Sequence, residues 1–277
     1  MNIFISVDIE GITGINNWKQ CNPGNEDYQR ARKLMTREIN AAIAGAKEGG
    51  ATNFLVNDAH GPMTNILIED LDPDARLISG SNKKLCQMEG IEKDFEGAFF
   101  IGYHAGDGNS DGTLNHTVLS NTVYEIKCNG KVVDEAAINA GIAGYFNVPV
   151  LFLAGDDITC TSAKERFKNI ITAETKKAVD RLTINSYGLQ KSHENIKSKA
   201  REAVKGIKSI FPYSVSSPVE FEVSFKVTSP ANMSQLFPQF KRIGSKTVKI
   251  TENDYLLAYK QLWGLLIFAR AVENGIL

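Results

Sequence analysis

Two carboxylates follow the first apolar segment of the chain, and their spacing suggests that they could bind a cation. Asp8 follows directly on residues 3–7, and Glu10 comes two positions later. Residues two apart on an extended backbone point to the same side, so the two carboxylates can converge on one cation. A pair of this kind can also cap a helix or lie in a solvated loop. Residues elsewhere in the chain decide between these interpretations.

Three of the four histidines follow predicted strands in the first half of the chain. His60, His104 and His116 each lie at or just beyond the end of such a strand. A single histidine in this position is more often structural than a metal ligand. The carboxyl ends of parallel strands, however, meet at one edge of a sheet, where ligands bind. Three histidines that converge there with Asp8 and Glu10 predict a metal site.

The types of these side chains indicate which metal and which reaction to expect. Imidazole and carboxylate together suit zinc, with manganese and iron as alternatives. The set offers more ligands than one tetrahedral ion needs, and a carboxylate can bridge two ions. Two ions about 3.5–4 Å apart polarise a carbonyl group and generate a hydroxide-like nucleophile near neutral pH. The residues themselves therefore predict a binuclear hydrolase.

Other polar residues near the same edge are expected to play supporting roles. Asp58 is predicted to orient His60 or to cap the following turn, with direct ligation as the alternative. Asp156 and Asp157 follow another strand and are predicted to cap the next helix. His193 lies in a polar stretch, and we assign it no function.

The elements that must position these residues are read from the apolar patterns. Nearly continuous apolar runs predict buried parallel strands, and 3.6-residue spacing predicts helices around them. Strands are expected at 3–7, 53–56, 76–78, 97–103 and 148–153, and helices at 31–46 and 135–146. The pattern predicts an α/β fold with a mainly parallel central sheet flanked by helices.

The pattern changes after about residue 160. An amphipathic helix is expected at 194–209, strands with one wet face at 219–227 and 247–251, and a final helix beyond them. We therefore expect an α/β metal-binding catalytic domain at 1–160. A smaller C-terminal α+β subdomain at 161–277 is expected to pack on it and to contribute to oligomerisation.

Length and composition exclude several classes of protein. The 277 residues carry a formal net charge of −1, which argues against a nucleic-acid-binding surface. No apolar run approaches membrane-spanning length, and no secretory signal precedes the first strand, so we expect a cytoplasmic protein without membrane partners. The four cysteines are scattered without a paired motif, so we expect reduced structural thiols.

Several motifs in the chain resemble those of a known family. S-V-D-I-E-G at 6–11, L-V-N-D-A-H at 55–60, G-Y-H-A at 102–105 and N-H-T at 115–117 occur in the family's order and with similar spacing. They resemble the zinc-dependent D-aminopeptidases, a family typified by the bacterial dipeptide-operon protein. The similarity covers most of the chain, including V-P-V-L-F-L-A-G-D-D at 148–157, and is weaker after about residue 160.

The resemblance implies a role for each site residue. It implies that two zinc ions per subunit are bound by Asp8, Glu10, His60, His104 and Glu135. It implies that His116 is the catalytic residue, described in the family as a nucleophile. Asp134 and Glu125 are alternative carboxylates near the last ligand position, and we choose Glu135 because it fits the frame V-x-E-x-x-x-N-A. Chemistry alone leaves open whether His116 transfers a proton to the leaving amine or attacks the carbonyl directly.

The implied activity is that of a metalloprotease, a D-stereospecific aminopeptidase. It would remove N-terminal D-amino acids from short peptides or amides such as D-Ala-D-Ala. The alternatives are a binuclear hydrolase acting on L-peptides or other small amides, and a non-catalytic, metal-stabilised peptide-binding protein. The resemblance also implies a large, ring-like homo-oligomer, such as a decamer.

Overall fold

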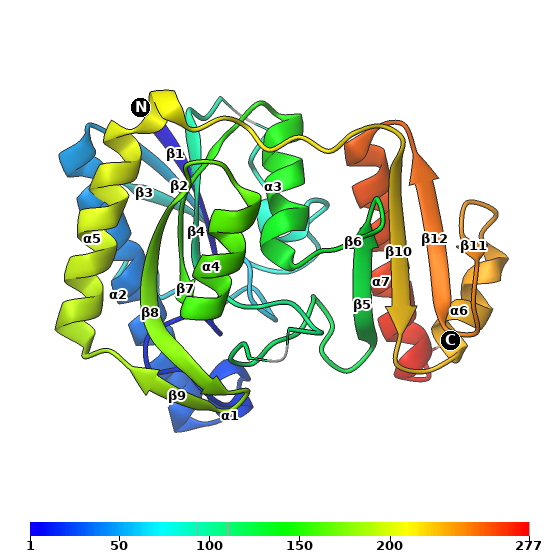
Figure 1. Ribbon diagram of the computed structural model, residues 1–277. Coiled ribbons are helices and arrows are strands. Elements are labelled where there is room, and N and C mark those ends of the chain that lie inside the picture. The colour runs from blue at the N-terminus through cyan, green and yellow to red at the C-terminus, as the bar shows by residue number, and fades with distance from the viewer. Residues whose placement is uncertain (93, 110, 277) are drawn as a thin grey trace.

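The computed structural model of the protein contains two β-sheets connected by helices (Figure 1). It describes residues 1–92, 94–109 and 111–276, so residue 277 of the expected C-terminal subdomain lies outside the described part. Sheet A, with seven strands, forms one side of the molecule in Figure 1, and sheet B, with five strands, forms the other.

Sheet A is parallel apart from its last strand. Its order is β3-β2-β1-β4-β7-β8-β9, and only the β8–β9 pair is antiparallel. The strands are β1 (Asn2–Val7), β2 (Asn53–Asp58), β3 (Ala75–Ile78), β4 (Gly97–Tyr103), β7 (Val150–Asp156), β8 (Ile171–Asp180) and β9 (Thr183–Ser186). The chain adds strands on one side of β1 first and then on the other. The switch point therefore lies between β1 and β4, where α/β sheets bind ligands.

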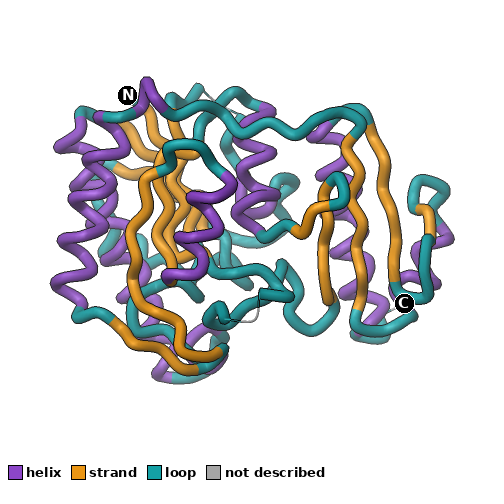
Figure 2. The backbone as a smooth tube through the Cα atoms, in the orientation of Figure 1, coloured by secondary structure: helices purple, strands orange, loops and turns teal. Residues whose placement is uncertain are grey.

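Helices cover both faces of sheet A. On one face α2 (Glu26–Gly49) packs against α5 (Leu189–Lys205), and on the other lie α3 (Glu135–Tyr145) and α4 (Asp157–Arg166) (Figures 1 and 2). Alternate residues of β1 serve the two faces: Ile3 and Ile5 pack with α2, and Phe4 packs with the α3 side. The strand is buried on both sides, as its apolar run predicts.

Sheet B is antiparallel and lies beside α7 (Tyr255–Glu273), which also contacts α3. Its order is β11-β12-β10-β5-β6. The strands are β5 (Val123–Cys128), β6 (Lys131–Val132), β10 (Val219–Phe225), β11 (Lys241–Arg242) and β12 (Thr247–Glu252). The short elements are α1 (Trp18–Cys21), α6 (Ser229–Met233), and the 3-10 turns η1 (Cys86–Met88), η2 (Ile207–Ser209) and η3 (Ser234–Leu236).

The predicted α/β class is confirmed, and the two sheets interleave along the chain. β8, β9 and α5 follow residue 160 yet belong to the sheet A layer, whereas β5 and β6 precede it yet belong to sheet B. A boundary at residue 160 therefore does not separate the sheets. None of the described helices combines the length and the apolar character needed to cross a membrane.

Candidate active site

A first cluster of ligand-type side chains, called here the first triad, consists of Asp8, Glu10 and His60. Nδ1 of His60 lies 2.9 Å from Oδ1 of Asp8 and 3.0 Å from Oε2 of Glu10. Both carboxylates are at least 98 % buried. The two carboxylates converge as their spacing predicts, and the histidine at the end of β2 joins them because β1 and β2 are parallel neighbours.

Close backbone packing holds the loop that carries these carboxylates. Gly11 has no room for a side chain, because a Cβ atom there would lie 2.0 Å from the carbonyl oxygen of Tyr103. Gly102 has a φ of +71°, and its Cβ would lie 2.1 Å from the carbonyl oxygen of Asp8. The ends of β1 and β4 can approach this closely only because both positions are glycine.

A buried lysine on β8 completes this support. Nζ of Lys176 donates to the carbonyl oxygens of Glu10 at 2.5 Å, Ile12 at 3.0 Å and Ile15 at 2.7 Å. Burial lowers the pKa of Lys176 to about 8. Three carbonyl acceptors on one ammonium group fix the path of the chain beyond Glu10. This role was not predicted from the sequence, since a lysine in a strand is ordinarily solvated.

His60 is oriented from behind by a backbone carbonyl. Its Nε2 lies 2.8 Å from the carbonyl oxygen of Cys21 at the end of α1, so Nε2 donates and Nδ1 faces the carboxylates. Asp58 does not touch the imidazole. Its carboxylate accepts the backbone N–H groups of Asn65 and Ile66 at 2.5 and 2.8 Å. Of the two predicted supporting roles, Asp58 therefore caps the turn.

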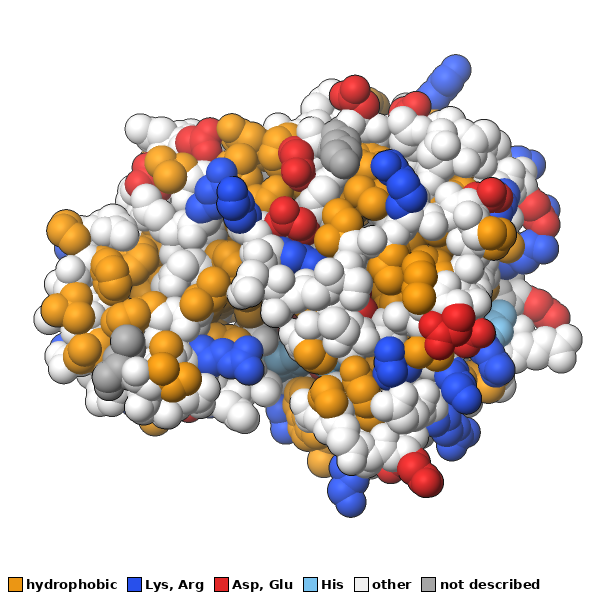
Figure 3. Space-filling view, turned by 180° about the vertical axis from the view of Figure 1, so that it is seen from behind, with side chains coloured by type: hydrophobic (Ala, Val, Ile, Leu, Met, Phe, Trp, Pro, Cys, Tyr) orange, Lys and Arg blue, Asp and Glu red, His pale blue; other side chains and the backbone are white. Residues whose placement is uncertain are grey.

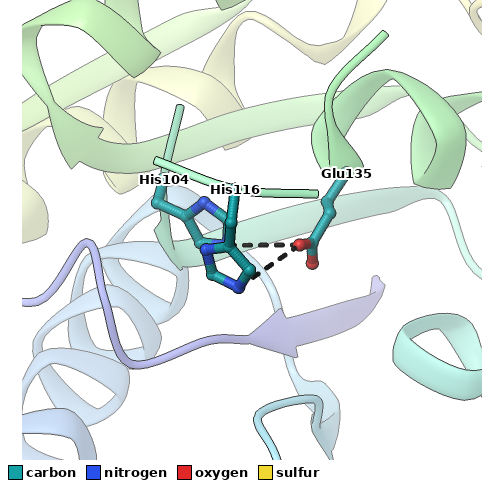
Figure 4. Close-up of side chains that lie close together, drawn as sticks. All are labelled: His104, His116 and Glu135. Carbon is teal, nitrogen blue, oxygen red and sulfur yellow. Dashed lines mark ion pairs between the residues drawn. The ribbon is translucent and has the colours of Figure 1, made fainter. Parts of the chain in front are cut away.

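The second triad consists of His104, His116 and Glu135 (Figure 4). The two imidazole rings stack with centroids 4.1 Å apart. Oε1 of Glu135 lies 3.3 Å from Nε2 of His104 and 3.9 Å from Nε2 of His116. In each histidine Nδ1 contacts a backbone carbonyl, at 2.9 Å in His104 and 2.8 Å in His116, which directs Nε2 to the centre.

The backbone around His116 adopts rare conformations. Leu114 has a φ of +49° and Val118 a φ of +61°. Positive φ is unusual for any residue with a side chain, and a genuine outlier for a β-branched one. The carbonyl of Leu114 accepts from His116 Nδ1, and the N–H of Val118 donates to Oε1 of Glu135 at 2.7 Å. Such local strain is typical of functional sites.

Gln87 links the two triads, a role that was not predicted from the sequence. Its Nε2 donates to Oδ2 of Asp8 at 3.2 Å and to Oε2 of Glu135 at 2.5 Å. Its Oε1 accepts from Asn139, which also donates to the hydroxyl of Tyr103. One buried amide therefore holds a carboxylate of each triad. A lone glutamine in η1 has no motif that could reveal this role.

The alternatives to Glu135 lie elsewhere. Asp134 accepts the backbone N–H of Ala137 at 2.8 Å and caps α3. Glu125 lies on β5 and pairs with Lys127 at 3.1 Å. The structure thus brings together all six residues singled out from the sequence, with Glu135 as the third carboxylate.

The caps predicted beyond β7 are also present in part. Asp156 accepts the backbone N–H of Thr159 at 2.8 Å at the start of α4, and also that of Thr113 at 2.9 Å. Asp157 accepts the backbone N–H of Ala178 on β8 at 2.9 Å. Asp156 therefore anchors the loop that leads to His116 as well as capping the helix.

The buried groups shift one another's pKa values. Burial, then the charge of Glu10, raises the pKa of Asp8 to about 7. Burial disfavours the charged form of Glu135, but the charge of His104 outweighs it and lowers this pKa to about 2. Burial likewise opposes protonation of His104, yet the carboxylates raise its pKa to about 10. His116 differs, because burial and the charge of His104 lower its pKa.

The donors at this centre fit a metal ion. Oε1 of Glu10 is buried without a hydrogen-bond partner among the described residues. Oε2 of Glu10 lies 3.0 Å from Nδ1 of His60, and Nε2 of His104 lies 3.3 Å from Oε1 of Glu135, but neither contact has the geometry of a hydrogen bond. Buried polar atoms are almost always paired, so orphaned donors and acceptors indicate a missing partner. Carboxylate oxygen and imidazole nitrogen are the ligands of zinc. Within each triad the ligand atoms lie within 4.8 Å of one another.

A cavity of about 670 Å³ opens over the triads. This volume suits a small-molecule or short-peptide ligand. Its outer walls combine aromatic and cationic side chains, among them Trp18, Trp263, Arg181, Lys226 and Arg270. Figure 3 shows a hollow on the face turned away in Figure 1, with a histidine inside it and lysine or arginine side chains beside it.

Fold and site define an α/β enzyme with a buried carboxylate–histidine centre at the switch point of a parallel sheet. The chain belongs to the D-aminopeptidase family, whose model matches residues 1–263. It is 34 % identical over 263 residues to the D-aminopeptidase of Bacillus subtilis (strain 168), covering 95 % of each chain. These matches confirm the family predicted from the motifs, and with it the class of enzyme, a D-aminopeptidase.

A solved structure agrees with the whole fold. The chain superimposes on the Zn-dependent D-aminopeptidase DppA from Bacillus subtilis, described as a self-compartmentalizing protease. The TM-score is 0.93 at 33 % identity, over 98 % of both chains. The similarity is therefore not limited to the catalytic half but includes sheet B and α7.

Proposed function

We propose that this protein is a binuclear zinc aminopeptidase that removes N-terminal D-amino acids from short peptides or amides of the D-Ala-D-Ala type. The observation that carries the proposal is the convergence of two buried triads, with orphaned ligand atoms, beneath one cavity. Family membership and the zinc dependence of the related Bacillus subtilis enzyme support the metal and the stereochemistry.

The proposed ligands are the first triad together with His104 and Glu135. Zinc bound there would supply Lewis-acid polarisation of the scissile carbonyl and would acidify water near neutral pH. The carboxylates carry the negative charge that two divalent cations require, and Gln87 fixes the position of Asp8 and Glu135. Metal binding would replace the protons that the imidazoles and Asp8 otherwise share.

His116 is proposed as the catalytic residue. Its Nδ1 donates to the carbonyl of Leu114, so Nε2 faces the triads with its lone pair free. Nε2 accepts the proton of the attacking water and delivers it to the leaving nitrogen as the C–N bond breaks. The lowered pKa suits this role, since an imidazole that is neutral at rest can act as a base.

The test is release of amino acid from D-Ala-D-Ala and from L-Ala-L-Ala, before and after chelation, with zinc added back. The proposal predicts release from the D-peptide only, lost on chelation and restored by zinc. Equal hydrolysis of both peptides would show a hydrolase without this stereospecificity. Release that survives complete removal of metal would contradict the zinc mechanism.

The related enzyme's description as self-compartmentalizing suggests how this chain assembles. We propose a closed, ring-like homo-oligomer, which multi-angle light scattering would test, and a monomer would contradict it. We further propose a cytoplasmic location, supported by four buried cysteines that are all unpaired. Fractionation of cells would test this location.

A further inference from the structure

Arg181 lines the cavity and has no part in the function described so far. It lies at the tip of the β8–β9 hairpin, which Figure 1 shows beside α1. Its carbonyl oxygen accepts the backbone N–H of Leu114 at 2.8 Å. The hairpin therefore reaches across to the loop that carries His116.

The guanidinium group of Arg181 is held in place on two sides. Its Nε donates to Oδ1 of Asn115 at 2.8 Å, and Nη2 lies 3.4 Å from the carbonyl oxygen of Asn115. Its Cζ lies 5.5 Å from the ring centre of Trp18, whose ring in turn packs edge-on against His116 at 5.3 Å. Cation–π stacking and hydrogen bonding together immobilise the charge next to the catalytic residue.

This charge has no counter-ion in the described part of the chain. None of the described carboxylates lies within ion-pair distance of Arg181. Arginine carries five N–H donors, and only the two contacts to Asn115 use them among described residues. A partly buried, rigid guanidinium with free donors is suited to bind a carboxylate in bidentate geometry.

The other two cations of the cavity are less suited to this role. Lys226 already donates to the carbonyl oxygen of Ser120 at 2.5 Å and lies 3.7 Å from Asp107. Arg270 is exposed near the end of α7, on a different wall, and also borders a neighbouring groove. Arg181 alone combines a fixed position with contact to residues that surround His116.

We propose that Arg181 binds the C-terminal carboxylate of the peptide substrate, and that the enzyme therefore selects di- and tripeptides with a free carboxyl end. The inference rests on the proposed aminopeptidase function. The ring centre of Trp18 lies 5.3 Å from that of His116 and 5.5 Å from Cζ of Arg181, so the imidazole and the guanidinium group are at most about 11 Å apart. An extended chain advances about 3.5 Å per residue, so a leaving group of one or two residues fits this separation. The triads would hold the scissile end while Arg181 fixes the other end.

The test compares D-Ala-D-Ala with the same dipeptide amidated at its C-terminus, using the zinc-loaded full chain. Wild-type enzyme is expected to prefer the free acid in kcat/KM by roughly 10–100-fold, the range of a charge-assisted hydrogen-bonded pair. Arg181→Gln is expected to lose most of this preference through a higher KM for the acid. Arg181→Lys keeps the charge without the planar fork and should fall between them.

The comparison of substrates separates binding from mere support of His116. If Arg181 only positions the loop, Arg181→Gln lowers kcat/KM for acid and amide equally, which overturns the inference. Equal rates on acid and amide by the wild type overturn it without any variant. Arg270→Gln is the matched control and should keep the preference for the free acid. If Arg270→Gln loses this preference and Arg181→Gln keeps it, the inference is overturned. If the wild-type enzyme hydrolyses neither D-Ala-D-Ala nor its amide, the proposed function is overturned, and the inference that rests on it falls as well.

Discussion

The two triads lie against each other but are built in different ways. The first triad comes from the ends of two adjacent parallel strands, β1 and β2. The second triad comes from the end of β4, the loop after it and the first turn of α3. His60 presents Nδ1 to the centre, whereas both histidines of the second triad present Nε2. The first triad is thus a product of sheet register, and the second of loop conformation.

This difference suggests a division of labour. The first triad is fixed by Lys176, by the glycine contacts and by a carbonyl behind His60. The second includes one histidine, His116, that faces the cavity beside Trp18 and differs from its neighbour in the direction of its pKa shift. We therefore propose that regular structure supplies a rigid binding centre, while the strained loop supplies the group that transfers the proton.

The largest effect is expected from His116→Ala. Because proton transfer by a positioned side chain contributes 10²–10⁴-fold, kcat should fall by about that factor. Zinc content measured by mass spectrometry should remain unchanged. His193→Ala, on α5, is the control and should alter neither quantity. A fall in zinc content with His116→Ala would instead make His116 a ligand of the second triad.

Gly102→Ala tests the close contact between the two strands that carry the triads. The added Cβ would meet the carbonyl oxygen of Asp8 at 2.1 Å on a backbone with positive φ. Overpacking and strain together should cost about 2–4 kcal/mol in the free energy of unfolding, measured with denaturant. Gly264→Ala, inside α7 with nothing within 4 Å, is the control. It should be neutral or stabilising by up to about 1 kcal/mol, and equal effects at both positions would contradict the account.

Glu38 gives the support of the first triad a pH dependence. Its Oε1 accepts the backbone N–H of Thr13 at 2.9 Å, and burial raises its pKa to about 7. Between the unfolded value and pH 7 the native state holds a proton that the unfolded chain has lost, so stability falls as the pH rises through this range. The total loss is roughly 3 kcal/mol. Asp8, whose pKa is also raised to about 7, contributes a slope of its own in both proteins. Denaturant titrations of wild type and Glu38→Gln at several pH values should therefore show a steeper fall in the wild type, and parallel curves would refute it.

The smallest effect is expected at the link between the triads. Gln87→Leu removes the amide that holds Asp8 and Glu135. Loss of a partner behind the ligands typically costs 10–100-fold in metal affinity, so competition with a chromophoric chelator should show weaker zinc binding of about this size. Gln190→Leu, exposed on α5, is the matched control. Unchanged affinity in Gln87→Leu would mean that the triads are positioned independently.

The same division decides how much could be predicted from sequence. Asp8, Glu10, His60 and His104 end apolar strands, so their convergence follows from the order of a parallel sheet. Glu135 needed the family resemblance to be singled out, and His116 needed it to be assigned catalysis instead of metal binding, because no periodicity places a loop residue or the first turn of a helix beside a strand end. The residues of the centre could be predicted from the sequence, whereas the residues that hold them in place became visible only in the fold.

What was missed has a physical reason in each case. Gln87, Lys176 and Arg181 act through single contacts across long sequence separations, which leave no local pattern. The β8–β9 hairpin was not predicted because the outer part of β8 is exposed and polar. Because β8 and β9 were not predicted, the return of the chain to sheet A after residue 160 was not anticipated.

The central proposal is that the first triad, together with His104 and Glu135, binds two zinc ions while His116 remains free to react. The most direct measurement is an anomalous difference map from a crystal of the zinc-loaded protein. We predict two peaks about 3.5–4 Å apart, one beside the first triad and one beside His104 and Glu135, with Nε2 of His116 beyond the coordination distance of about 2.1 Å. A single peak, or a peak bonded to His116, would contradict the account.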